Sequence, residues 1–272
     1  MASQSFLDSS DHALARQFLQ DGYIVRPAET PETLEEMRKT VLSEANLWLS
    51  SCGHNTHLRS LAESHDSISP QILNDIRLHL FARLNTIENL RQKYFELGSS
   101  LLQSLVGNEL AMQNKVNLSI QQPLDQSSVL ELHSDVWSGD SPFQVVLWVP
   151  LTDSSGTNAM FLLRPELSFQ AYQRALSGEL HSMAHIHEVY KEEFEQIEVK
   201  FGQIVIFDSN CLHGNQLNTT DTSRWSLNCR IAGLLAPATT PERRLGAYYT
   251  PIMVRAATRM GLRAMEALGL LK

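Results

Sequence analysis

The sequence ELHSDVW, residues 131–137, follows a segment in which apolar and polar side chains alternate. Alternation with a period of two is typical of a β-strand that is buried on one face. Residues i and i+2 of such a strand point the same way, so His133 and Asp135 share a face while Ser134 points elsewhere. A second histidine, His213, follows another strand-like run at residues 203–208. We therefore expect a fold that brings two distant strand ends together.

Strand-like runs fill the chain from about residue 108 to residue 235. They are Val116 to Gln121, Val129 to His133, Gln144 to Pro150, Ala159 to Leu163, Ile197 to Lys200, Ile204 to Asp208 and Arg224 to Leu234. Many short strands separated by turn signals predict a sandwich or barrel. Helical periodicity dominates the N-terminal part, residues 1–107, and returns in a C-terminal extension, residues 236–272. We expect a single domain over residues 1–272, mainly β, with flanking helices outside the barrel.

Proline and serine punctuate the helical regions. Thr250-Pro251 places a proline at the first position of an expected C-terminal helix, and residues 165–176 are predicted as a helix inserted between strands. Residues 50–68, rich in serine and histidine, are predicted as a loop. A basic stripe recurs every four residues at Arg255, Arg259 and Arg263. We interpret it as a solvated face, and contact with anionic lipid or a partner is the alternative.

Composition excludes several classes of protein. The chain has 272 residues, 43% of them hydrophobic, and a formal net charge of −8 without a cationic cluster, which argues against non-specific nucleic-acid binding. Three cysteines, Cys52, Cys211 and Cys229, are too few for a disulfide framework and favour a reducing compartment. Residues 1–6 show no secretory signal, and no apolar run approaches the ~18–20 residues of a membrane span. These features predict a cytoplasmic protein without a membrane span.

His133, Asp135 and His213 form a candidate metal site. Two histidines and one carboxylate with open coordination positions are the ligand set of non-haem Fe(II) oxygenases. By itself the His-x-Asp spacing is weak evidence, because such pairs arise by chance and often lie on the surface. The strand-end positions of both histidines, and an arginine that follows His213, favour the metal site.

Arg224 and Ser226 form a candidate anchor for 2-oxoglutarate. A guanidinium fork matches the planar carboxylate of that co-substrate better than an ammonium group does, and Ser226 adds a hydroxyl on the same strand face. The alternative is a structural ion pair of Arg224, for example with Asp221. Arg230 is a second candidate, because it also lies an even number of residues along the strand and either anchors the co-substrate or meets an acidic substrate.

The sequence from about Asn114 to Leu235 resembles the phytanoyl-CoA dioxygenase-like family of Fe(II)/2-oxoglutarate-dependent oxygenases. The strongest match is HGNQLNTTDTSRWS, residues 213–226, and FLQDGYIV, residues 18–25, resembles the N-terminal segment of the family. The chain is also similar to oxygenases encoded among surface-carbohydrate genes. The resemblance implies a double-stranded β-helix core, a jelly-roll of cupin-like type.

The resemblance also implies roles for single residues. It makes His133, Asp135 and His213 the Fe(II) ligands and Arg224 the co-substrate anchor, and it implies that Trp148, Leu118 and Asn215 line the co-substrate. The presence of Asp135 argues against the halogenating relatives, which vacate that ligand position for chloride. The chain departs from the acyl-CoA-oxidising members after Asp135 and in residues 165–200, which argues against an acyl-CoA substrate.

Other polar and aromatic residues are candidates for substrate contact, with structural roles as the alternative. They are Trp137, Gln144, Asn117, Gln121 and Arg230. A second group, His181, His185 and His187, lacks an acid or cysteine at suitable spacing to complete a metal site. We expect these histidines at the surface or at the rim of a pocket.

The expected function is that of an Fe(II)- and 2-oxoglutarate-dependent dioxygenase. It would use O2 to hydroxylate, or otherwise oxidise, a C–H bond of a small molecule, with succinate and CO2 as co-products. The resemblance suggests a polar metabolite or sugar derivative as substrate, and no oligomeric state is indicated. Two alternatives are a cupin-type metal-dependent hydrolase or isomerase and a non-catalytic metabolite-binding barrel. Arg224 with Ser226 favours the oxygenase over both.

Overall fold

The computed structural model describes residues 6–269 of the chain. The expectation that residues 1–6 form no secretory signal falls outside this range, apart from Phe6. None of the described helices has both the length and the apolar character that a membrane crossing requires.

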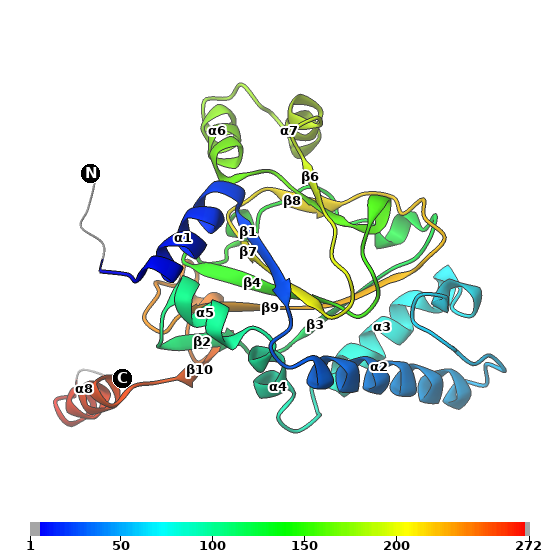
Figure 1. The fold of residues 1–272 in the computed structure, drawn as a ribbon, viewed down its shortest axis with the longest axis horizontal. Helices are drawn as coiled ribbons and strands as arrows, with labels where there is room; N and C mark the ends of the chain where they lie inside the picture. Colours follow the sequence, from blue (N-terminus) through cyan, green and yellow to red (C-terminus); the bar gives the residue numbers. More distant parts are fainter. Residues whose placement is uncertain (1–5, 270–272) are drawn as a thin grey trace.

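Two antiparallel sheets form the centre of the molecule (Figure 1). The larger sheet has the order β1-β7-β4-β9-β2-β10, with β3 also paired to β9, and the smaller one has the order β6-β5-β8. The strands are β1 (Tyr23–Pro27), β2 (Leu110–Gln113), β3 (Asn117–Gln121), β4 (Gln144–Pro150), β5 (Met160–Leu162), β6 (Glu195–Ile197), β7 (Gln203–Asp208), β8 (His213–Asn215), β9 (Arg224–Gly233) and β10 (Tyr249–Met253).

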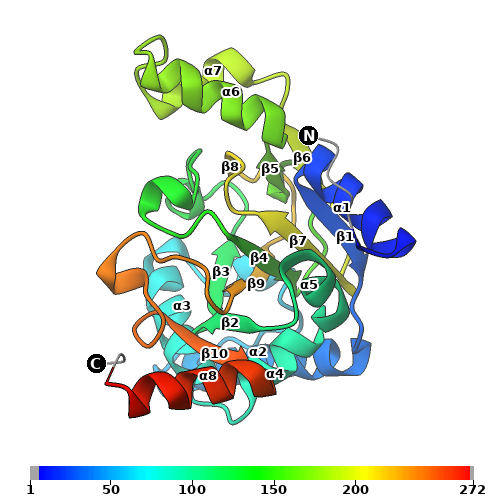
Figure 2. The same cartoon turned by 90° about the vertical axis from the view of Figure 1, so that its left-hand side faces the viewer.

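Helices surround these sheets rather than interrupt them. They are α1 (Ser9–Asp21), α2 (Pro31–Ser51), α3 (Pro70–Leu84), α4 (Leu90–Glu96), α5 (Ser99–Val106), α6 (Pro165–Leu176), α7 (Met183–Tyr190) and α8 (Ala256–Ala267). Short 3-10 turns lie at residues 64–66, 126–128, 136–138, 156–158 and 241–243. Figure 2 shows α6 and α7 at one end of the molecule and α2, α4 and α8 at the other.

Each face of the larger sheet packs against a different layer. The outward side chains of β3, β4, β7 and β9 join those of α2 to α5 in the largest apolar core of the described residues. The inward side chains of β4 and β7 meet those of β5 and β6 in a second core, which lies between the two sheets. Alternation along each strand therefore separates a helix-facing side from a barrel interior.

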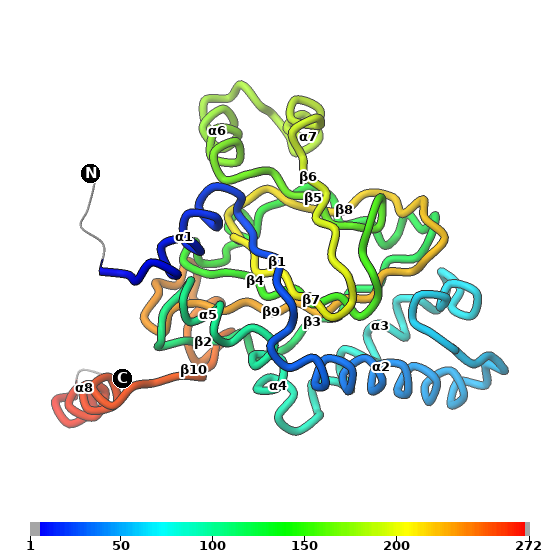
Figure 3. The backbone as a smooth tube through the Cα atoms, in the orientation of Figure 1, coloured from blue at the N-terminus to red at the C-terminus, as the bar shows by residue number. Residues whose placement is uncertain are grey.

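The ends of the described chain are tied into the larger sheet. In Figure 3 the N-terminal strand β1 runs beside β7, and their register pairs Tyr23 with Phe207. At the other edge β10 pairs with β2. The strands of the C-terminal extension and of the N-terminal part thus complete the same sheet as the central strands.

Most predicted elements are present, with boundaries that differ by a few residues. The helix over residues 165–176 is confirmed, and residues 50–68 form a loop apart from the end of α2 and one 3-10 turn. The strand β2 and the three-residue strand β8 were not predicted. The strand predicted at residues 197–200 lies earlier, in β6.

Two predictions of secondary structure were wrong. Residues 129–133 do not form a strand, because only His133 makes a β-bridge, with His213, while the side chain of Asn215 binds the backbone N–H of Leu130. The C-terminal helix does not begin at Pro251 but at Ala256. Pro251 lies instead in β10, an edge strand, where a residue without an N–H is tolerated.

Candidate metal centre and its cavity

Two imidazoles and one carboxylate converge inside the barrel. His133, Asp135 and His213 each offer a ligand atom, and these atoms lie within 4.8 Å of one another. The two imidazole rings are 4.3 Å apart between centroids. Reciprocal backbone hydrogen bonds of 2.9 Å between His133 and His213 hold the two residues side by side. The set could hold a metal ion, and it is the one group of this kind found among residues 6–269.

Glycine at position 214 lets these two segments approach each other. A Cβ atom there would lie 2.9 Å from the carbonyl oxygen of Leu130 and 3.1 Å from that of Glu131. The next residue, Asn215, accepts a 2.5 Å hydrogen bond from the backbone N–H of Leu130. The pair Gly214 and Asn215 therefore draws residues 130–133 against β8.

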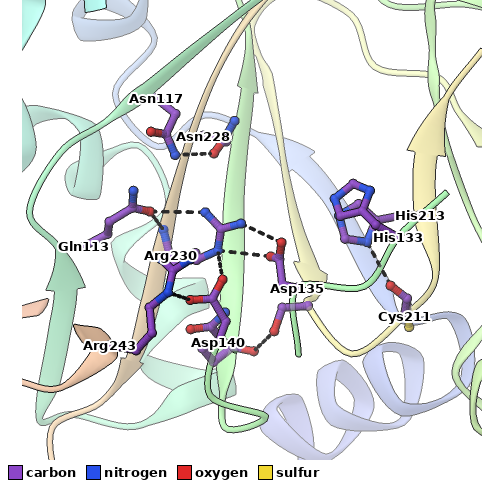
Figure 4. Close-up of polar contacts among 12 residues, drawn as sticks. Gln113, Asn117, His133, Asp135, Asp140, Cys211, His213, Asn228, Arg230 and Arg243 are labelled. Carbon is purple, nitrogen blue, oxygen red and sulfur yellow. Dashed lines mark hydrogen bonds and ion pairs between the residues drawn. The ribbon is translucent and has the colours of Figure 1, made fainter. Parts of the chain in front are cut away.

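Both imidazoles present the same nitrogen to the site. Nδ1 of His133 lies 2.8 Å from the carbonyl oxygen of Glu131. Nδ1 of His213 lies 2.8 Å from the carbonyl oxygen of Cys211 (Figure 4). A carbonyl oxygen only accepts, so each Nδ1 carries the proton and each Nε2 keeps a free lone pair. Burial, with a smaller contribution from His133, lowers the pKa of His213 to about 4, so this ring is neutral at pH 7.

The carboxylate of Asp135 is held on one side by Arg230. Burial by itself raises the pKa of Asp135, but Arg230 and His213 more than offset it, and the pKa lies below its usual range. Arg230 donates from Nη2 to Oδ1 at 2.5 Å and from Nε to Oδ2 at 3.1 Å. The buried Asp140 forms ion pairs with Arg230 at 3.1 Å and with Arg243 at 3.3 Å, and burial raises the pKa of Asp140.

His133, Asp135 and His213, called the metal-binding set below, line a cavity of about 130 Å³. Its lining residues are Ser119, Leu130, His133, Asp135, Val146, Trp148, Met160, Phe207, His213, Gly214, Asn215, Arg224, Asn228 and Arg230. The polar members come from β3, β8, β9 and residues 133–135, and the apolar members come mainly from β4, β5 and β7. The cavity therefore combines hydrogen-bonding groups with an apolar surface that excludes water.

Arg224 contributes an uncompensated positive charge to this cavity. Its side chain is buried, and no carboxylate in the described part of the chain forms an ion pair with it. Nη1 and Nη2 make long hydrogen bonds to Asn158 O (3.3 Å) and Ser119 Oγ (3.4 Å), while Nε has no partner. Burial lowers the pKa of Arg224 to about 10, still well above neutrality. Such a group fits an anionic ligand.

Ser226 lies beside Arg224 on the same face of β9. Its hydroxyl is fully buried and has no hydrogen-bond partner among the described residues. A buried hydroxyl without a partner costs free energy, which a ligand oxygen would recover.

The chain is similar in sequence to known proteins. The sequence pattern described as "Phytanoyl-CoA dioxygenase (PhyH)" matches residues 18–226. The chain belongs to the phytanoyl-CoA dioxygenase family. Within the curated proteins, it is 27% identical over 99 residues to the streptomycin biosynthesis protein StrG of Streptomyces griseus. That alignment covers 36% of this chain and 35% of StrG, so it spans about a third of that relative.

Solved structures with a similar fold include several non-haem enzymes. The ThoJ–Ni complex, a non-haem monooxygenase, has a TM-score of 0.55 at 19% identity and covers 93% of this chain and 94% of its own. The carbocyclase SnoK has a TM-score of 0.53 at 16% identity, with 92% and 95% covered. The epimerase SnoN in complex with Fe3+, alpha ketoglutarate and nogalamycin RO has 0.51 at 14%, with 91% and 96% covered. At these identities the likeness establishes the fold, and it confirms the expected jelly-roll core with flanking helices.

Some of the residues that the family resemblance placed beside the co-substrate line the cavity, and others do not. Arg224, Trp148 and Asn215 line the cavity, and Ser226 lies between two lining residues of β9. Leu118 does not line it, which corrects the expectation for that residue. Its side chain belongs to the helix-facing core, because Leu118 lies one position before Ser119 on β3 and alternate residues face opposite sides.

Of the residues expected to contact substrate, only Arg230 lines the cavity. Asn117 bonds to Asn228, Gln121 bonds to the backbone of Gln216, and Gln144 accepts from the hydroxyl of Tyr249. Trp137 is 44% exposed and packs against Tyr172. Arg230 itself pairs with two carboxylates of the chain, Asp135 and Asp140, which compensate its charge.

Several lining residues were missed from the sequence. Ser119 and Asn228 were missed although the signal was present, since Ser119 lies between Asn117 and Gln121 and Asn228 between Ser226 and Arg230 on the same strand faces. The sequence did not indicate that Met160 and Phe207 line the cavity, because buried strands contain many apolar residues of this kind. The cluster His181, His185 and His187 is exposed, as expected. Two of its members lie on a helix, α7.

Proposed function

We propose that the chain is an Fe(II)- and 2-oxoglutarate-dependent oxygenase that oxidises a C–H bond of a small molecule with O2. In this proposal His133, Asp135 and His213 hold the metal, and residues 1–272 act as one oxygenase domain. The observation that carries the proposal is the buried, unpaired guanidinium of Arg224, which lines the same cavity as the metal-binding set. A metal-dependent hydrolase that uses only a metal ion and water does not require the positive charge of Arg224. A non-catalytic metabolite-binding barrel does not require it either.

The residues fit the groups that the family implies. The two free Nε2 lone pairs and the Asp135 carboxylate supply the donor set typical of non-haem Fe(II). The partnerless Nε of Arg224 and hydroxyl of Ser226 suit a carboxylate of 2-oxoglutarate, with Trp148 and Asn215 lining its place. When bound, iron and 2-oxoglutarate supply the O2-activating chemistry, and succinate and CO2 are the co-products.

The chain's own residues bind, orient and exclude water. The carbonyls of Glu131 and Cys211 hold a proton on Nδ1 of each histidine, so it is Nε2 of each ring that would bind the metal. Val146, Trp148 and Phe207 form an apolar wall that lowers access of water to the reacting atoms. Arg224 would fix the far end of the co-substrate, because a guanidinium fork donates two parallel hydrogen bonds to a planar carboxylate.

For the substrate we propose a polar natural product or a sugar derivative. The match to StrG, a streptomycin biosynthesis protein, supports this class, as does the SnoN complex with nogalamycin RO. The three free cysteines support a cytosolic location.

Succinate release tests the proposal. Protein loaded with Fe(II) without oxygen and then exposed to O2 should convert 2-oxoglutarate to succinate, and metabolites that stimulate the release identify the substrate class. Asp135→Ala should abolish the release, and Arg224→Ala should weaken 2-oxoglutarate binding by about 1.5–3 kcal/mol, the range for hydrogen bonds to charged groups. Undiminished succinate formation by Asp135→Ala would refute the ligand set.

A further inference from the structure

Arg230 and Asp135 form an unusually enclosed ion pair. Their side chains are only 17% and 3% exposed, respectively. Every other ion pair within residues 6–269, outside the contacts of Asp140, has at least one exposed partner. Enclosing two charges costs desolvation free energy that a surface pair avoids. The position of this pair, directly beside the metal-binding set, therefore suggests a role other than stability.

The contact has a fork-to-fork geometry. Two different nitrogens of Arg230 donate to the two different oxygens of Asp135, Nη2 to Oδ1 at 2.5 Å and Nε to Oδ2 at 3.1 Å. Such a pair uses the lone pairs that both oxygens direct in front of the carboxylate. A metal ion chelated by both oxygens would occupy that same place. The guanidinium and a chelated ion therefore exclude each other, and a metal reaches only one oxygen from the outer side.

The arrangement of the other ligands agrees with this restriction. In Figure 4 the carboxylate of Asp135 lies between Arg230 on one side and the imidazoles of His133 and His213 on the other. The chelating side of the carboxylate thus faces Arg230.

Arg230 is itself held in place. Asp140, whose side chain is 1% exposed, lies 3.1 Å from Nε of Arg230 and also pairs with Arg243. Gln113 Oε1 accepts from Nη1 at 3.5 Å and from the backbone N–H of Arg230 at 3.3 Å. Turning the guanidinium away from Asp135 would break several of these contacts in a buried place.

We infer that Arg230 is a positioning residue that limits Asp135 to metal coordination through one oxygen. Coordination through both oxygens would fill a position that 2-oxoglutarate or O2 needs, so the restriction keeps the metal open. This inference rests on the ligand set proposed above. It assigns to Arg230 a role in co-substrate access rather than in substrate recognition.

Arg230→Gln tests the inference, because glutamine keeps a polar side chain but cannot fork both oxygens. Ni(II) affinity, followed by tryptophan fluorescence, should stay within about threefold of wild type, while 2-oxoglutarate should bind the Ni(II)-loaded variant about tenfold more weakly, a difference of about 1.4 kcal/mol. The visible absorption spectrum of the Co(II)-loaded variant should differ from wild type before 2-oxoglutarate is added. Arg83→Gln, which removes an arginine from the exposed pair with Glu44, is the control and should change none of these readouts.

Two results would overturn the inference. One is an unchanged 2-oxoglutarate affinity together with an unchanged Co(II) spectrum. The other is a loss of Ni(II) affinity with normal 2-oxoglutarate binding once the metal is loaded, which would make Arg230 an orienting group only. If Arg230→Gln does not fold, Asp140→Asn retains the guanidinium but loosens its support, and should shift 2-oxoglutarate affinity in the same direction by a smaller factor.

A separate measurement distinguishes failure of this inference from failure of the proposed function. His133→Ala and His213→Ala should lose Ni(II) binding if the ligand set is correct. If both histidine variants lose Ni(II) binding, and neither Arg230→Gln nor Asp140→Asn changes the affinity for 2-oxoglutarate, only the role of Arg230 is rejected. Normal Ni(II) binding by both histidine variants would reject the ligand set itself.

Discussion

Replacing Arg224 with methionine should stabilise the ligand-free protein while weakening 2-oxoglutarate binding by about 1.5–3 kcal/mol. Arg224 is 3% exposed and has no carboxylate partner among the described residues, so its charge is desolvated without compensation. Methionine has a similar length and no charge, and it can pack against the apolar side of the cavity. A residue kept at the expense of stability is expected where a ligand completes its interactions.

The magnitude follows from the effect of burial on the arginine. Burial lowers the pKa of Arg224 from 12.5 to about 10. At about 1.4 kcal/mol per unit, the cost of burying the charge is about 3 kcal/mol. The two long hydrogen bonds, to Asn158 and Ser119, offset part of that cost, at about 0.5–1 kcal/mol each. We expect a net gain of about 1–2 kcal/mol, which raises Tm by roughly 2–8 °C.

Thermal unfolding with Ni(II), with and without 2-oxoglutarate, measures both effects. Wild type at a ligand concentration of about 100 times its Kd should gain about 2.7 kcal/mol, whereas Arg224→Met at the same concentration should gain only about 0.3–1.3 kcal/mol. Arg224→Lys is the matched control, because it keeps the charge and loses the fork: it should show no stabilisation and weaker ligand binding. Because the pKa is lower in the folded state, the advantage of Arg224→Met is fully present at neutral pH and shrinks only as pH rises past about 10. A lower Tm for Arg224→Met with an intact 2-oxoglutarate shift would refute the reasoning.

Three further predictions concern the walls and ligands of the cavity. Gly214→Ala places a Cβ 2.9 Å from the carbonyl of Leu130, so it should displace residues 130–133, cost about 1–3 kcal/mol of stability and weaken Ni(II) binding in a fluorescence titration. Leu118→Ala should cost about 2–5 kcal/mol in urea unfolding yet leave the 2-oxoglutarate affinity of the folded protein unchanged, whereas Ser119→Ala should lower that affinity with little loss of stability; the reverse pattern would contradict the assignment of strand faces. The pKa of His213 in the metal-free protein is lowered to about 4 by burial, so the unfolded state binds the proton first and stability should fall as pH drops from about 6.5 towards 4. His213→Gln should remove this segment of the pH–stability curve, and its persistence would show that another group is responsible.

The fold was predictable because its strands carry period-two alternation and its turns carry glycine, proline and aspartate. The prediction failed where pairing is irregular. Residues 129–133 alternate like a strand, but the bonds that Leu130 makes to the side chain and backbone of Asn215 leave only the bridge of His133 with His213. Pro251 was taken as a helix start, because the sequence does not reveal that β10 is an edge strand that tolerates proline.

The grouping of His133, Asp135 and His213 was predictable because each histidine follows a strand-like run and an arginine follows His213, whereas the His-x-Asp pair alone was weak evidence. The surroundings of this group were less predictable. The ion pair of Arg230 with Asp135 joins residues that are far apart in the sequence. No feature of the sequence around Arg230 distinguishes a partner of Asp135 from a residue that binds substrate. Leu118 was misplaced by one position, which on a strand exchanges the cavity face for the helix face. Residue types therefore identified the chemistry, whereas strand register decided which side chains serve it.

The register of β9 links the two halves of the site. Arg224 and Arg230 lie on the same face of this strand, six residues apart, which corresponds to about 20 Å at about 3.3 Å per residue. The guanidinium of Arg224 lies 5.9 Å from the ring of Trp148, whose partner in the sheet is Asn228, so the side chain runs along the strand towards the metal-binding set. The strand is paired on both sides, by β4 and by β3 with β2, which fixes its register. A shift of the strand register by one residue would turn the side chains of Arg224, Ser226 and Arg230 into the helix-facing core together. The proposed binding of the co-substrate by Arg224 and the ion pair of Arg230 with Asp135 therefore depend on the same register.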